Sequence, residues 1–96
     1  MTRNEFIEFL NTNGISHKDE NVNGLELVYV YGKSEKVEDP MDPNKVRDFV
    51  PYLRVSHFDE SEDRWYTRDC GYCSYKSVSW ILKKCKELGG VKWKLL

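Results

Sequence analysis

Alanine and glutamine are absent from the 96 residues of this chain. Because alanine has the highest intrinsic helix propensity, any helix here must be held mainly by the packing of larger side chains. No apolar run approaches the ~20 residues that a membrane-spanning helix needs, and the first residues lack the apolar stretch of a secretory signal. Three cysteines are an odd number, which argues against a secreted disulfide framework. These absences predict a cytoplasmic protein with no membrane partner.

Aromatic side chains are plentiful, with three Trp, six Tyr and four Phe. A disordered chain lacks such residues, because it cannot bury enough apolar area to offset its conformational entropy. A chain of this length supports one hydrophobic core and not two. We therefore predict a single folded domain over residues 1–96.

Hydrophobic periodicity predicts an α+β domain with the element order α-β-β-β-α-β. Thr2 and Glu5 have the spacing of a capping box, which predicts a first helix that ends near Gly14. The other expected elements are strands at 25–31, 52–58 and about 65–67, a helix from Ser74 or Tyr75 to Leu88, and a last strand over 91–95. A small antiparallel or mixed sheet with both helices packed on one face would bury all of their apolar stripes.

Residues 33–48 predict a long exposed loop. They contain Asp39-Pro40 and Asp42-Pro43 among many other charged residues. Proline cannot donate to a strand ladder, and it disfavours helix for the residue before it. Residues 15–23 are also polar and predict a shorter loop.

Cys70 and Cys73 form the only compact chemical motif, a Cys-x-x-Cys pair ahead of the predicted second helix. A helix N-terminus stabilises a thiolate and so lowers a cysteine pKa. The segment 67–74 leading into a helix resembles the strand–CxxC–helix start of glutaredoxins. This resemblance implies a thiol-redox protein with Cys70 as nucleophile and Cys73 as resolving thiol. In that family a cis-proline follows the motif, whereas the last proline of this chain, Pro51, precedes it. The alternative is a tight turn in which Gly71 supplies backbone freedom.

A structural zinc site is a further interpretation, with Cys70, Cys73 and His57 as ligands. Cys85 is excluded from it, because a position about twelve residues along the helix lies ~18 Å from the helix start. Cys85 falls in the apolar stripe of this helix and is predicted to be a small buried side chain. His57 alternates with Leu53 and Val55, which favours a core or edge histidine. We therefore predict neither a metal nor another cofactor.

Charge is unevenly distributed along the chain. Residues 1–63 carry seven Lys or Arg against fourteen Asp or Glu, a net of −7, and residues 64–96 carry eight against two, a net of +6; these sum to −1. Charged runs are most often solvated surface, and the alternative is that acidic segments imitate nucleic-acid phosphates in a basic groove. The acidic candidates are the segment 35–42 and the predicted turn with Asp59, Glu60, Glu62 and Asp63.

The predicted second helix carries a basic outer surface. Helical geometry places Trp80 with Lys76 and Lys83 opposite Val78, and Lys84 on a flank. An exposed Trp among lysines fits a hot spot for a protein partner, or a stacking platform beside phosphate contacts. Packing of Trp80 under the 33–48 loop is the alternative. The order α-β-β-β-α also resembles that of double-stranded-RNA-binding domains, which implies nucleic-acid contact through the second helix.

No order of Ser, His and Asp or of Cys and His predicts a nucleophile, and no glycine-rich phosphate loop occurs. We therefore predict a small, non-enzymatic binding or regulatory protein that acts by surface contact on a protein partner. In size and in its lack of alanine the chain resembles the accessory and inhibitor proteins of phages and mobile elements, which implies inhibition of host or defence machinery. The alternatives are a thiol-redox protein and a nucleic-acid-binding domain with a basic last helix.

Overall fold

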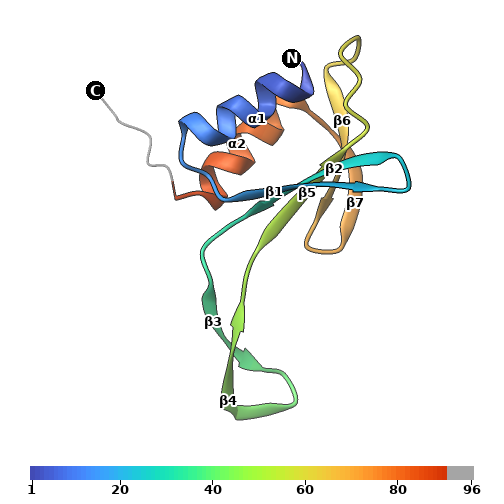
Figure 1. Cartoon of the computed structure of the whole chain (residues 1–96). Helices are drawn as coiled ribbons and strands as arrows, with labels where there is room; N and C mark the ends of the chain where they lie inside the picture. The colour runs from blue at the N-terminus through green and yellow to red at the C-terminus, as the bar shows by residue number, and fades with distance from the viewer. Residues whose placement is uncertain (91–96) are drawn as a thin grey trace.

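The computed structural model describes residues 1–90, which form two helices and seven strands (Figure 1). Their bounds are α1 Arg3–Thr12, β1 His17–Val22, β2 Leu25–Tyr31, β3 Glu35–Asp39, β4 Asp42–Phe49, β5 Tyr52–Ser56, β6 Arg64–Asp69, β7 Tyr72–Ser77 and α2 Val78–Leu88. Five strands make an antiparallel sheet of order β1-β2-β5-β6-β7, and β3 and β4 make a separate two-stranded sheet. The predicted α+β class is confirmed.

One hydrophobic core joins the two helices to the five-stranded sheet. Figure 1 shows α1 and α2 side by side on one face of that sheet. Strand side chains alternate between faces, so every second residue of the central strands points at the helices. The buried residues of this core are Phe6, Leu10, Ile15, Val28, Val30, Leu53, Val55, Trp65, Val78, Ile81 and Cys85. Within residues 1–90, no helix covers the opposite face of the sheet.

The capping box predicted for α1 is confirmed. The backbone N–H of Glu5 donates to Thr2 Oγ1 at 3.0 Å, and the backbone N–H of Thr2 donates to Glu5 Oε1 at 2.9 Å. These two bonds satisfy N–H groups that have no partner inside the helix. The helix then buries Phe6 and Leu10, one turn apart, against the sheet.

Replacing Thr2 by alanine is expected to lower the free energy of unfolding by about 1 kcal/mol, the usual contribution of an N-cap side chain. Thr2→Ser keeps the acceptor oxygen and is the matched control, so it should lose much less in the same urea titration. The backbone hydrogen bond from Thr2 also lowers the pKa of Glu5. The carboxylate therefore contributes to the stability of the folded state at neutral pH, and this contribution is lost as the pH falls through the folded-state pKa of Glu5. An equal decrease in the free energy of unfolding for Thr2→Ala and Thr2→Ser would show that the acceptor oxygen of Thr2 does not stabilise α1.

The prediction of a loop over residues 33–48 is wrong. These residues form the β3–β4 hairpin, which projects away from the rest of the molecule as an arm (Figure 1). Pro43 is tolerated in β4 because each strand of a two-stranded sheet has a free edge, where a missing N–H breaks no ladder bond. The register shifts between Glu38 and Asp39, next to the turn that holds Pro40. The predicted exposure of the segment is nevertheless correct, since all residues from Pro43 to Phe49 are exposed.

Two further segments differ from the predicted element order. His17–Val22 was expected in a loop and is β1, and Tyr72–Ser77 was expected in a turn and helix and is β7. Neither segment alternates apolar with polar residues, and each is held by backbone pairing with β2 or β6. Helix α2 begins at Val78 because the Ser77 hydroxyl caps it, accepting from the N–H of Trp80 at 3.2 Å. The strand predicted over 91–95 lies outside the described residues.

Candidate functional site

The sheet register brings polar and aromatic side chains from all five strands to the face that no described helix covers. Directly paired residues of antiparallel strands lie on the same face. Tyr29 pairs with Arg54, and Arg54 pairs with Arg68 on the next strand. We call this surface the tyrosine–arginine face; its residues are Lys18, Glu20, Leu27, Tyr29, Tyr31, Tyr52, Arg54, Ser56, Tyr66, Arg68, Cys73 and Tyr75.

Five of the six tyrosines lie on this face and form two groups of ring contacts. In the first, the Tyr29 and Tyr31 rings stack with centroids 6.2 Å apart, and Tyr29 and Tyr52 lie 6.3 Å apart. In the second, Tyr66 and Tyr75 meet edge to face at 5.2 Å. Tyr75 is 57% exposed and the other four are half-buried. The face therefore offers rings that are held in place by one another and remain partly accessible.

Two arginines lie between the tyrosine groups. Arg54 and Arg68 sit directly opposite each other on β5 and β6, and neither has an ion pair with a carboxylate of residues 1–90. The Nε atom of Arg54 is buried and has no hydrogen-bond partner among those residues. By contrast, Lys18 at the edge strand is paired with Glu20 at 2.8 Å. Like charges opposite each other on a sheet are destabilising, so an anion bound between the two guanidiniums would relieve the repulsion.

Tyr66 and Cys73 interact beside this arginine pair. Arg68 pairs with Cys73 on β7, and Tyr66 pairs with Tyr75 on the same strand. A side-chain hydrogen bond with Cys73 raises the pKa of the Tyr66 phenol. The phenol is therefore uncharged at neutral pH and adds no negative charge to the face.

The predicted strand–CxxC–helix arrangement is wrong. Cys70 (φ 49°) and Gly71 (φ 110°) form the turn of the β6–β7 hairpin, and Cys73 lies within β7. The tight-turn interpretation of Gly71 is confirmed, but the turn leads into a strand. The Cys70 Sγ is 3.6 Å from the carbonyl oxygen of Tyr52, and α2 begins only at Val78. The glutaredoxin resemblance depends on the partial positive charge of a helix N-terminus beside the nucleophilic thiol. The N-terminus of α2 is not adjacent to Cys70.

The residues of the predicted zinc site are not brought together. His57 directly follows Ser56, the last residue of β5, whereas Cys70 lies beside Tyr52, the first residue of the same strand. The rise along a strand places these two ends about 16 Å apart. His57 has a φ of 57°, which ends the alternation of β5 and turns the imidazole outward, where it contacts the Ser56 hydroxyl at 2.9 Å. The expected position of His57 on the core face is therefore wrong. Across residues 1–90, no three His, Cys, Asp or Glu side chains converge as metal ligands.

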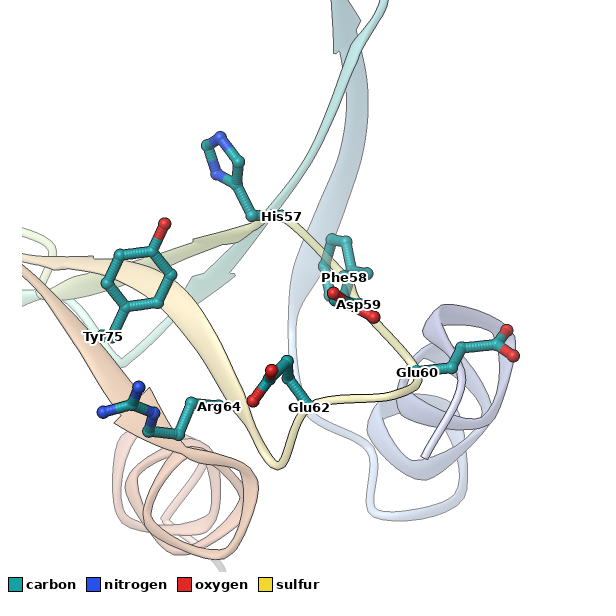
Figure 2. Close-up of a pocket in the computed structure, with 7 residues that line it drawn as sticks. All are labelled: His57, Phe58, Asp59, Glu60, Glu62, Arg64 and Tyr75. Atoms are coloured by element: carbon teal, nitrogen blue, oxygen red, sulfur yellow. The ribbon is translucent and has the colours of Figure 1, made fainter.

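A cavity of about 740 Å³ lies at the β5–β6 loop, at one end of the tyrosine–arginine face. Its lining residues are His57, Phe58, Asp59, Glu60, Glu62, Arg64 and Tyr75. Figure 2 shows Tyr75 and Arg64 on the side of the strands, with Glu62 on the facing loop. Hydrogen bonds from the hydroxyl and backbone N–H of Ser61 lower the pKa of Asp59. Three of the four predicted acidic residues thus line this cavity, and Asp63 is exposed nearby on the same loop.

The basic surface of α2 lies away from the tyrosine–arginine face. Trp80 is half-buried and packs partly against the core, so it is less exposed than predicted. The ammonium of Lys76 lies 4.9 Å above the Trp80 ring, in a cation–π contact. Lys83 and Lys84 line a shallow depression of about 210 Å³ with Trp80, and Lys84 is 3.7 Å from the carboxylate of Asp69. Two of these lysines are therefore already engaged within the molecule.

Comparison with protein-family models, with curated proteins and with solved structures finds no significant match to this chain. No helix within the described part of the chain is long and apolar enough to cross a bilayer. The chemistry of the candidate site is therefore argued from its own residues.

Proposed function

We propose that this chain is a non-enzymatic binding protein that acts by surface contact through the tyrosine–arginine face. One observation carries the proposal: the register gathers five tyrosines and two arginines on a sheet face that no described helix covers, and neither arginine has an ion pair within residues 1–90. Tyrosine and arginine are the residue types that contribute most per contact at binding surfaces, because they combine large area with directed hydrogen bonding. The proposal includes a cytoplasmic location, as the odd cysteine number predicts.

Two alternatives have weaker support. The thiol-redox interpretation needs a helix N-terminus beside Cys70, and that helix begins eight positions later at Val78. The basic-helix interpretation needs an exposed Trp80, and that ring is partly buried beneath Lys76. A role as an inhibitor encoded by a phage or mobile element remains the finer form of the proposal, and it rests on composition alone.

Site-specific photo-crosslinking tests which surface binds. A photoreactive amino acid replaces Tyr75 in one variant and, in matched controls, Lys83 on α2 or Val46 on the β3–β4 arm. All three positions are exposed, so none of these changes disturbs the core. In lysate of the cells that naturally express the chain, only the Tyr75 variant is expected to form an adduct that excess wild-type protein competes away.

Two results would contradict the proposal. Competed adducts from the Lys83 variant alone would favour the basic surface of α2. The absence of any adduct from the Tyr75 variant, with its fold verified by circular dichroism, would remove the tyrosine–arginine face as the binding surface.

A further inference from the structure

The arginine pair has the geometry of a phosphate site. Arg54 and Arg68 are directly paired neighbours on β5 and β6, with no carboxylate of the described residues bonded to either. Guanidinium groups present a planar fork of donors that matches phosphate oxygens. Arg68 is exposed and Arg54 is half-buried, so a ligand at the surface can reach this pair. An oxyanion placed between the two groups would satisfy both and remove their mutual repulsion.

The flanking tyrosines have the geometry of stacking platforms. Tyr29 is the direct neighbour of Arg54 on one side, and the edge-to-face pair Tyr66 and Tyr75 lies in the adjacent row across the sheet. Neighbouring strands are ~4.8 Å apart, so these rings lie within a few ångströms to about 10 Å of the arginine pair. Aromatic rings beside a cationic track are how proteins hold unpaired bases along a phosphate backbone.

We infer that the ligand of the tyrosine–arginine face is a single-stranded nucleic acid, with phosphate bound at Arg54 and Arg68 and bases stacked on the tyrosines. This inference rests on the proposed function of the face. A duplex keeps its bases stacked on one another and cannot present them to these rings.

A protein partner fits the face less well. Tyrosine and arginine occur at both kinds of interface, but a protein interface also has an apolar core. The exposed aliphatic side chains next to this face, Val22 and Leu25, are paired with each other at the end of the β1–β2 hairpin and do not lie among its tyrosines and arginines. The carboxylates of Asp59, Glu60 and Glu62 at the cavity repel phosphate, so they confine the backbone to the arginine row. We therefore expect a short site, at the low end of the ~4–16 nucleotides typical of single-strand binding folds.

The test is fluorescence anisotropy with labelled oligothymidylate and oligouridylate of about 12 nucleotides, within the usual range of site sizes. Two phosphate contacts on a single strand give a slope of about −1.4 for log K against log salt, or a roughly sevenfold loss of affinity between about 50 and 200 mM salt. The Arg54→Gln/Arg68→Gln double variant should bind with almost no salt dependence. Tyr75→Leu should bind roughly 5- to 150-fold more weakly, as expected for loss of one stacked base.

Matched variants separate stacking from general surface damage. Tyr75→Phe keeps the ring and should keep the affinity, and Lys83→Gln removes a charge from α2 and should change nothing. Amide chemical shifts of the unmodified protein give a readout that does not depend on any variant folding. On addition of oligothymidylate they should move at Tyr29, Arg54 and Tyr66, and they should stay in place at Lys83.

Several outcomes would overturn the inference. Loss of binding in Lys83→Gln, or shifts confined to α2, would move the site to the basic helix. Equal affinity for a duplex of the same sequence would exclude base stacking. If oligonucleotides do not bind at low salt while the Tyr75 crosslinker captures a protein, the nucleic-acid inference is wrong and the proposed binding face stands. If neither is captured, both proposals fail.

Discussion

Replacing Trp65 by alanine is expected to lower the free energy of unfolding by about 3–5 kcal/mol, the range for deleting a fully buried large aromatic. Trp65 is completely buried at the centre of the core. Its ring lies 5.5 Å from that of Phe6 on α1 and 4.9 Å from that of Phe58, both in edge-to-face contact. The indole Nε1 also donates to the carbonyl oxygen of Asp59 at 3.3 Å, which anchors the acidic loop to the core.

Urea denaturation followed by far-UV circular dichroism measures this effect, because the substitution removes a tryptophan fluorophore. Domains of this size are stable by only ~5–15 kcal/mol, so a large part of the population would unfold under mild conditions. Trp80→Ala is the matched control: its ring is only partly buried at the edge of the core, and its loss should be clearly smaller. An equal decrease in the free energy of unfolding for Trp65→Ala and Trp80→Ala would contradict the placement of Trp65 at the centre of the hydrophobic core.

Stability is expected to fall at alkaline pH through Cys85. Burial raises the pKa of this thiol to about 12. In the unfolded chain the thiol ionises near its ordinary pKa of ~8.5, so above that pH the unfolded state binds fewer protons than the native state. The free energy of unfolding therefore decreases as the pH rises, by about 1.4 kcal/mol per pH unit between the two pKa values.

The measurement compares the pH slope of the wild-type protein with that of Cys85→Ala between about pH 9 and pH 11. The variant loses stability at all pH values because it leaves a cavity, but it should lack the slope due to the thiol. Tyrosines and lysines titrate in both proteins, so their contribution cancels in the difference. If Cys85→Ala keeps the wild-type slope of unfolding free energy against pH, burial does not raise the pKa of the Cys85 thiol.

The elements predicted correctly are those whose apolar residues recur with the period of the element itself. Residues 25–31 alternate Val28 and Val30 with polar or aromatic positions, and this strand is observed as β2. The stripe from Val78 to Cys85 is buried along α2 as predicted. The burial of Cys85 followed from the same periodicity, because a 3.6-residue repeat specifies which side chains face the core.

The candidate site was only partly predictable. The acidic loop and the lysines of α2 were identified, since charge runs are visible locally. The tyrosine–arginine face was not identified, although each central strand carries its signal: Tyr29, Arg54 and Tyr66 occupy the positions that alternate with core residues. Local alternation shows that each residue faces away from the core. It does not show which residues of different strands become neighbours.

The amino-acid sequence by itself determined the α+β class, the capped first helix, the apolar strands of the core and the burial of Cys85, because periodicity and capping act within a few residues. Only the tertiary structure decided the polar strands β1, β3, β4 and β7, which have no apolar face of their own and exist through backbone pairing with a partner. The same long-range pairing moved Cys70 to a hairpin turn and set Arg54 opposite Arg68 among the tyrosines. Register is a property of strand pairs, so a surface built across five strands becomes visible only when those strands are assembled.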